Sequence, residues 1–159
     1  MTRTGWKQAW LLSVMAGLMV AGCGDKAWFS WKKKSLYDRL GGEKAIRAVS
    51  HDFIDRAAKD PKVNFTRHGT AKEWHPNAQQ LAHLEDMVVQ LVCMVTGGPQ
   101  KYTGRDIKEL HRGMKISQAE FDAMAGDLAA SLDQFHVPKA EKDELLAIIA
   151  GTAKDVVEM

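Results

Sequence analysis

The apolar positions along the chain return at helical spacing in four long segments. These segments cover residues 43–58, 78–96, 118–135 and 138–157. In the first of them, Ala45, Val49, Phe53 and Ala57 form one stripe while charged residues fill the other side, which is typical of an amphipathic helix. No segment alternates between apolar and polar side chains as a half-buried strand does. The pattern therefore predicts an all-α fold. The short connections between the predicted helices favour antiparallel neighbours.

The expected helix ends coincide with residues that stop or start helices. Asp60-Pro61 and Gly97-Gly98-Pro99 follow the first two predicted helices, since proline cannot continue a helix and glycine tolerates a left-handed turn. Ser117 and Glu120 fit a capping box at the start of the third helix. Pro138 suits the first turn of the fourth. These signals support separate helices with ends at these positions.

The N-terminal residues have the pattern of an exported precursor. An apolar run over residues 10–20 follows two basic residues; it is shorter than the roughly 20 residues of a membrane span and suits a signal peptide. Val20-Ala21-Gly22-Cys23 is similar to a bacterial lipobox. We therefore expect a lipoprotein signal peptide over 1–22, with lipid on Cys23 anchoring the protein to the membrane on the periplasmic face of the cell envelope. The alternatives are an uncleaved anchor and an ordinary signal peptide.

Residues 23–34 are expected to be a lipidated linker. Trp28, Phe29 and Trp31 are aromatic side chains of the kind that favour the headgroup level of a membrane. The lysines at 32–34 are attracted to anionic lipid. A solvated linker with no membrane role is the alternative.

Length and composition narrow the possible functions. The chain has 159 residues, which suits one folded domain, and its net charge of +2 predicts no nucleic-acid partner. The two cysteines, Cys23 and Cys93, form neither a Cys-x-x-Cys nor a Cys-x-x-Cys-His motif. The sequence therefore indicates neither a redox dithiol nor a covalent c-type haem attachment.

The clearest candidate for chemistry is His111, which lies between the second and third long helices. Gly113 and the β-branched Ile116 make a continuous helix through His111 unfavourable. We expect His111 to end a short helical turn, with its imidazole free to act as a single ligand. Four other histidines are expected to lie on the surface or in satisfied core positions. They are His51, His68, His75 and His136.

Short motifs around His111 and at the helix ends are similar to those of one protein family. They are the octet at 35–42, Gly97-Gly98-Pro99, Tyr102-Thr103-Gly104, Leu110-His111, Ile116-Ser117 and Phe121. Together they resemble the truncated haemoglobins of group I. The resemblance covers about residues 35–157 and implies a globin domain over 35–159, folded as a two-over-two helical sandwich. It also implies haem b (iron protoporphyrin IX), bound without covalent links, with His111 as the axial ligand of the iron.

The same resemblance implies which side chains surround the haem. The cofactor-binding residues would be His111, Phe65, Leu84, Val88, Tyr102, Ile116, Phe121 and Met124. The distal, gas-binding side would be formed by Phe53, Ile54, Leu84 and Val88. Many relatives carry a tyrosine where this chain has Ile54, so we expect an apolar distal wall from which oxygen dissociates readily. The sixth ligand at rest is left open between water, His83 and Met87. The stretch from 66 to 77 is expected to be a mobile surface loop.

Three functions agree with these features. The first is a globin that reversibly binds oxygen, nitric oxide or carbon monoxide at the cell envelope, as an oxygen-binding or carrier protein. The second is a haem enzyme, a nitric-oxide dioxygenase or a peroxidase-like protein, which would depend on a separate electron donor. The third is a cofactor-free helical lipoprotein that binds a protein partner. An absorption spectrum distinguishes the third from the first two.

Overall fold

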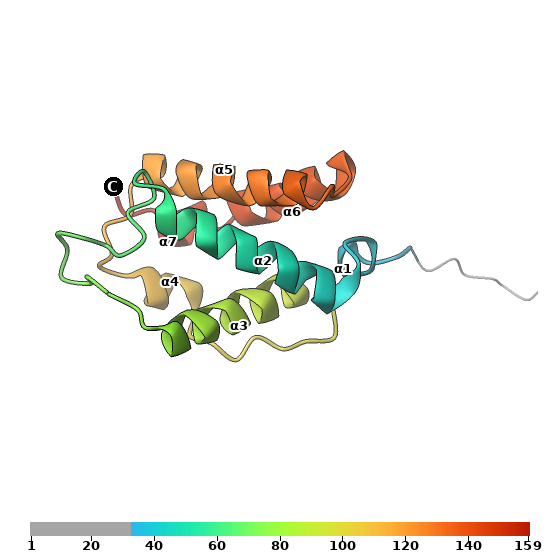
Figure 1. Cartoon of the computed structure of the whole chain (residues 1–159), viewed down its shortest axis with the longest axis horizontal. Coiled ribbons are helices and arrows are strands. Elements are labelled where there is room, and N and C mark those ends of the chain that lie inside the picture. The colour runs from blue at the N-terminus through green and yellow to red at the C-terminus, as the bar shows by residue number, and fades with distance from the viewer. Residues whose placement is uncertain (1–32) are drawn as a thin grey trace, which may run out of the picture. The chain divides into compact units, whose positions relative to one another are not determined.

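The computed structural model describes residues 33–159, so the predictions for Cys23, the signal peptide and the linker up to residue 32 lie outside the described residues. Seven helices follow one another, and residues 33–159 contain no strand (Figure 1). They are α1 (Leu36–Arg39), α2 (Gly42–Lys59), α3 (Ala78–Val95), α4 (Ile107–His111), α5 (Gln118–Gln134), α6 (Lys139–Ala150) and α7 (Ala153–Val156). The predicted all-α class is therefore confirmed.

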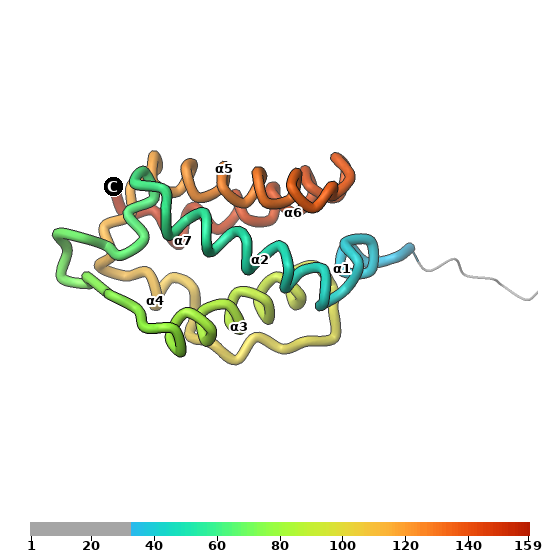
Figure 2. The backbone as a smooth tube through the Cα atoms, in the orientation of Figure 1, coloured from blue at the N-terminus to red at the C-terminus, as the bar shows by residue number. Residues whose placement is uncertain are grey.

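Two pairs of helices build the fold. α2 packs on α3, and α5 packs on α6, while α2 also contacts α5 and so joins the two pairs (Figures 1 and 2). This arrangement is the predicted two-over-two sandwich. The short α4 lies in the long connection between α3 and α5, beside α7. The pairs leave room between α2, α3 and α4, where the functional site is found.

Local sequence signals fix the helix ends. Ser117 and Glu120 form the predicted capping box, in which the serine hydroxyl accepts the backbone N–H of Glu120 and the glutamate accepts the N–H of Ser117 at 2.8 Å. Asn77 and Gln80 do the same at the start of α3, a cap that sequence reasoning did not identify. The last predicted helix is interrupted: α6 ends at Ala150, and α7 begins only at Ala153. The break lets the C-terminus turn back toward α4.

The core lies where the two pairs of helices meet. Its fully buried members include Val89 and Cys93 from α3, together with Ser131 and Leu132 from α5. Burial raises the pKa of the Cys93 thiol, so this cysteine stays protonated and behaves as a small apolar side chain, as expected. Within the described residues, no helix is both long and apolar enough to cross a membrane.

Leu132→Ala should destabilise the fold strongly, because Leu132 is only 1% exposed and truncation leaves a cavity between the helix pairs. We expect the free energy of unfolding to fall by about 2–5 kcal/mol. Urea titration followed by circular dichroism measures the change. The exposed Gln134 on the same helix is the control, and Gln134→Ala should shift the midpoint little. Equal losses in both variants would mean that the core does not lie where the two pairs meet.

Candidate functional site

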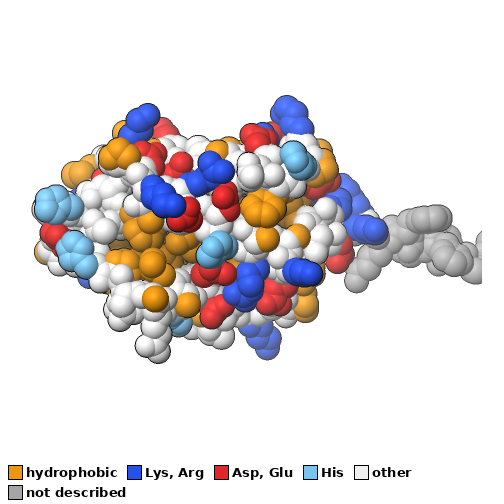
Figure 3. Space-filling view, in the orientation of Figure 1, with side chains coloured by type: hydrophobic (Ala, Val, Ile, Leu, Met, Phe, Trp, Pro, Cys, Tyr) orange, Lys and Arg blue, Asp and Glu red, His pale blue; other side chains and the backbone are white. Residues whose placement is uncertain are grey.

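A large cavity opens between α2, α3, α4 and the start of α5. Its volume is about 1180 Å³, more than the roughly 300–1000 Å³ of most small-molecule pockets. Hydrophobic side chains gather in a hollow on the face seen in Figure 3, among charged side chains of both signs. Every residue predicted to bind the cofactor or to form the distal side lines this cavity. They are Phe53, Ile54, Phe65, Leu84, Val88, Tyr102, His111, Ile116, Phe121 and Met124.

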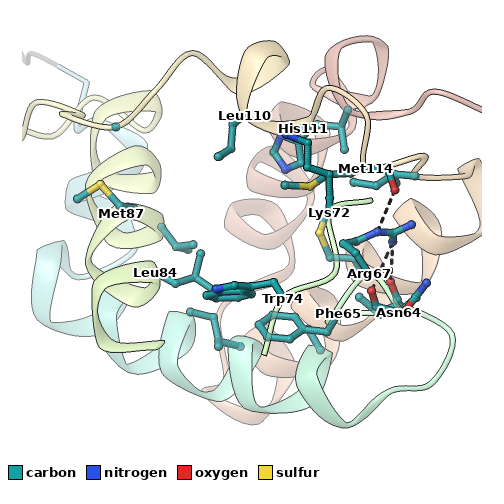
Figure 4. A pocket seen from close by; sticks show the side chains of 18 of the residues that line it. Asn64, Phe65, Arg67, Lys72, Trp74, Leu84, Met87, Leu110, His111 and Met114 are labelled. Carbon is teal, nitrogen blue, oxygen red and sulfur yellow. Dashed lines mark hydrogen bonds between the residues drawn. The ribbon is translucent and has the colours of Figure 1, made fainter. Parts of the chain in front are cut away.

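His111 is the last residue of α4, and its ring is oriented by the helix itself. Its Nδ1 lies 2.7 Å from the carbonyl oxygen of Ile107, one turn earlier. Because a carbonyl oxygen can only accept a hydrogen bond, Nδ1 must carry the proton. In the neutral form of this ring the lone pair is on Nε2, which is the atom that binds a metal in this tautomer. Figure 4 shows the ring at the cavity, facing the space enclosed by the α3 side chains.

The turn that follows His111 is held by the C-terminus, an interaction that sequence reasoning missed. The carboxylate of Glu158 accepts the backbone N–H groups of Gly113 and Lys115, each at 2.7 Å. The Gly113 and Lys115 amides lower the pKa of the Glu158 carboxyl below its ordinary value. Its own backbone N–H donates to the carbonyl oxygen of Ile116 at 2.8 Å. The chain beyond α7 is therefore part of the support for the histidine.

Glu158→Gln should loosen this turn, because a neutral amide accepts hydrogen bonds more weakly than a carboxylate. We expect faster hydrogen exchange at the Gly113 and Lys115 amides, measured by NMR. The carboxyl pKa is lowered by folding, so its contribution is complete above the unfolded value of about 4.3 and is lost as the pH falls through the lower folded value.

The difference in protection between wild type and Glu158→Gln should therefore shrink at acid pH. Asp122→Asn, which changes an exposed carboxylate on α5, is the control and should leave both amides as they are. Unchanged exchange in Glu158→Gln at neutral pH would contradict a supporting role for the C-terminus.

The wall predicted to be distal is built from hydrocarbon side chains of the two long helices. α2 contributes Phe53 and Ile54, and α3 contributes Leu84 and Val88. None of these side chains can donate a hydrogen bond. His83 and Met87 also line the cavity from α3, with His83 exposed at its edge and Met87 half-buried. Their role as a sixth ligand stays a prediction.

The remaining predicted residues surround the cavity from other directions. Tyr102 comes from the connection before α4, and its side chain lies against Gly104, where an added Cβ would collide with the tyrosine ring. Phe121, which is buried, and Met124 come from the first turns of α5. A second apolar cavity of about 300 Å³ borders the first and is also lined by His111. Together these residues make a deep apolar site.

The connection between α2 and α3 is largely exposed, as expected of a surface loop, but one part of it reaches the cavity. Its tryptophan, Trp74, is half-buried and lines the cavity, with its ring 6.1 Å from that of Phe65 at an interplanar angle of 44°. The backbone N–H of Trp74 donates to the carbonyl oxygen of Thr66 at 2.9 Å, which closes the loop on itself. Most other residues of the loop stay on the surface, where the exposed His68 and His75 both lie within hydrogen-bond distance of Glu73. In the sequence, the one indication that this loop reaches the cavity is a single tryptophan within a polar stretch.

Arg67 fastens the base of this loop to the other side of the cavity. The side chain is buried, with the residue only 7% exposed, and its guanidinium donates to the carbonyl oxygen of Met114 at 3.0 Å and to the Glu120 carboxylate at 3.1 Å. Burial alone would raise the pKa of the Glu120 carboxyl, but the Ser117 backbone N–H and Arg67 outweigh it and lower the pKa. The guanidinium of Arg67 therefore joins the α2–α3 loop to the turn after His111.

Arg67→Gln should destabilise the protein, because Glu120 and several carbonyl groups would lose a buried partner. We expect a loss of about 3 kcal/mol in the free energy of unfolding, typical of breaking a buried ion pair. Urea titration measures the loss, and limited proteolysis should show faster cleavage between residues 66 and 77.

Lys139→Gln is the matched control, because the Lys139 side chain is 83% exposed and its pair with Asp143 on the surface contributes little. If Arg67→Gln were as stable as Lys139→Gln, the arginine would not be what holds the loop.

The cavity fits a large planar apolar cofactor held by one imidazole. Its walls are mainly apolar, and His111 presents an oriented Nε2 to it. Within residues 33–159, no three His, Cys, Asp or Glu side chains gather to hold a metal ion by themselves. A porphyrin supplies four nitrogen ligands of its own and needs only one from the protein, which suits this arrangement. The fold and the site together define a haem globin.

Comparison with known proteins gives the same class. The family described as bacterial-like globin matches residues 35–158. The group 1 truncated haemoglobin of Tetrahymena pyriformis is 31% identical over 126 residues, 79% of this chain and 97% of that protein. Group 1 truncated haemoglobin GlbN of Mycolicibacterium paratuberculosis is 31% identical over 122 residues, 77% of this chain and 83% of that protein.

Solved structures agree with the sequence relatives. The Fe(III) form of the Tetrahymena pyriformis truncated haemoglobin superposes with a TM-score of 0.67 at 28% identity, covering 79% of this chain and all of that chain. The haemoglobin of Chloroflexus aurantiacus, at 21% identity and a TM-score of 0.63, shares the fold. The chain belongs to the bacterial-like globin family, as a truncated haemoglobin. Its cofactor is haem, and it is a gas-binding globin.

Proposed function

We propose that this chain binds a diatomic gas reversibly at the cell envelope, with haem b held through His111. The observation that carries the proposal is the orientation of the His111 ring by Ile107, which leaves Nε2 free at the cavity. Haem iron with one axial imidazole supplies an open coordination position for a small ligand. Oxygen and nitric oxide are the proposed ligands, and carbon monoxide is a useful probe of the same position.

The protein residues would bind and shield the cofactor. Phe65, Tyr102 and Ile116 line the cavity beside the buried Phe121, and with Met124 they present apolar surface to a porphyrin. Burial of that surface contributes about 25 cal/mol per Å², so the pocket can hold haem without a covalent link. Phe53, Ile54, Leu84 and Val88 would keep water from the gas-binding side.

His111→Gly should abolish tight haem binding, because the pocket would lose the imidazole proposed to hold the iron. We expect either loss of the Soret band or a shifted band whose intensity falls as haem dissociates during gel filtration. Imidazole added to the solution should restore the ferric and ferrous spectra of the wild type.

His51→Gly, at an exposed position on α2, is the control and should keep the wild-type spectrum. A His111→Gly protein that retained its colour and gas uptake without imidazole would refute the assignment. Wild-type protein with no Soret band after expression with haem would favour a cofactor-free interaction protein instead.

The proposed location rests on the N-terminal sequence. Cys23 would take up lipid and become the new N-terminus when the signal peptide is removed, so that the lipid anchors the globin domain on the periplasmic face of the membrane. Cys23→Ser should therefore move the protein from the membrane fraction to the soluble fraction and abolish incorporation of labelled palmitate. Cys93→Ser, which changes the buried cysteine, should keep the membrane location. Lipid labelling that persisted in Cys23→Ser would contradict the anchor.

A further inference from the structure

The distal side of the cavity contains one hydrogen-bond donor that the two long helices do not supply. Trp74 is the only tryptophan within residues 33–159, and its indole lines the cavity. We propose that the indole N–H of Trp74 donates a hydrogen bond to oxygen bound in this pocket, and so makes Trp74 the residue that sets ligand selectivity. The inference rests on the proposed function and adds a donor to a distal side that the sequence predicts to be apolar.

The placement of the indole supports this role. Figure 4 shows the ring extending from the α2–α3 loop toward α3, beside Leu84 and across the cavity from His111. Its nitrogen lies at the edge of the ring nearest Leu84, one of the predicted distal residues (Figure 4). Within residues 33–159 no hydrogen bond involves the Trp74 side-chain nitrogen, and the hydrogen bonds drawn in Figure 4 involve Arg67. The indole N–H is therefore available to a ligand.

The loop holds the indole in place rather than leaving it free to swing. The Trp74 backbone is bonded to Thr66, and the Trp74 ring packs on the ring of Phe65. Arg67 ties the base of the loop to Met114 and Glu120 on the opposite wall. A donor that is fixed before the ligand arrives costs little entropy to use, which makes its hydrogen bond more effective.

Most other polar groups at the cavity are engaged or face solvent, and the half-buried Tyr102 comes from the connection before α4 rather than from the side of Leu84 and Val88. Gln80 is used in the capping box of α3, Asn64 contacts His68, and the hydroxyl of Thr103 donates to Gln90 at 2.9 Å. The Arg67 guanidinium donates to backbone carbonyl groups and to Glu120. The exposed polar residues are Lys72, Gln79, His83 and Arg105. Trp74 is thus the best-placed donor toward the distal side.

A single donor would distinguish between gases. Oxygen takes up more negative charge in a haem pocket than carbon monoxide does, so it gains more from an N–H group pointing at it. A hydrogen bond of ordinary strength changes a dissociation rate by about tenfold. Trp74 would therefore slow the release of oxygen and leave that of carbon monoxide nearly as it is.

Trp74→Phe tests the donor, because phenylalanine keeps an aromatic ring but has no N–H. In the full-length haem-loaded protein in detergent, we expect oxygen to dissociate about tenfold faster and carbon monoxide less than about twofold faster. Stopped-flow ligand replacement measures both rates. The infrared C–O stretch of the carbon monoxide complex gives a second readout, since a donor near the ligand weakens that bond. The stretch should move to higher frequency in Trp74→Phe.

Two further variants make the result specific. His75→Ala changes the next residue, whose side chain is 74% exposed, and should leave both rates and the C–O frequency unchanged. Leu84→Gln in the Trp74→Phe protein adds a donor from α3, and should restore slow oxygen release and the lower C–O frequency.

Several outcomes would overturn the inference. Equal oxygen dissociation rates in wild type and Trp74→Phe would do so, as would a rise that is the same for both gases. The wild-type C–O stretch is decisive even if Trp74→Phe fails to fold: a single band at the frequency of a purely apolar pocket rules the donor out. A wild-type protein that takes up no haem would instead refute the proposed function itself, and the Soret band reports that separately.

Discussion

The site depends on the hydrogen bond between His111 Nδ1 and the Ile107 carbonyl oxygen. One turn of helix supplies both partners, so α4 needs only a few residues to select the tautomer and the direction of the ring. A helix this short has little stability of its own. Its position is given by neighbours instead: it contacts α7, and the turn after it is bonded to Glu158. The ligand geometry is thus local, while its support comes from the far end of the chain.

The two sides of the cavity are linked through a buried cation. Arg67 belongs to the loop that carries Trp74, yet its hydrogen-bond partners Met114 and Glu120 lie on the side of the histidine. Arginine suits this position because its planar group offers several donors in fixed directions. Its backbone has a φ of 53°, a conformation that non-glycine residues seldom adopt and that the surrounding hydrogen bonds must hold. Arg67 thereby makes the long connection between α2 and α3 part of the pocket wall.

Sequence reasoning predicted the parts of the structure that depend on local patterns. The helices, the Ser117 capping box and the placement of Leu84 and Val88 at one cavity follow from periodicity, capping chemistry and family motifs. It failed where contacts between residues far apart in the sequence determine the structure. Nothing near Arg67 in the sequence indicates a partner at Glu120, and the polar residues around Trp74 resemble those of any exposed loop. The break between α6 and α7 was also missed, because the apolar pattern continues through it toward Val156.

The position of the last residues has a practical consequence for anyone who produces this protein. Glu158 and Met159 both donate backbone hydrogen bonds to Ile116, and the Glu158 side chain accepts from the turn beside His111. An affinity tag or fluorescent fusion joined after Met159 would begin next to that turn. Such a fusion can alter the colour and gas uptake of the purified material without any change in the pocket itself, so untagged protein is the sound reference for spectroscopy.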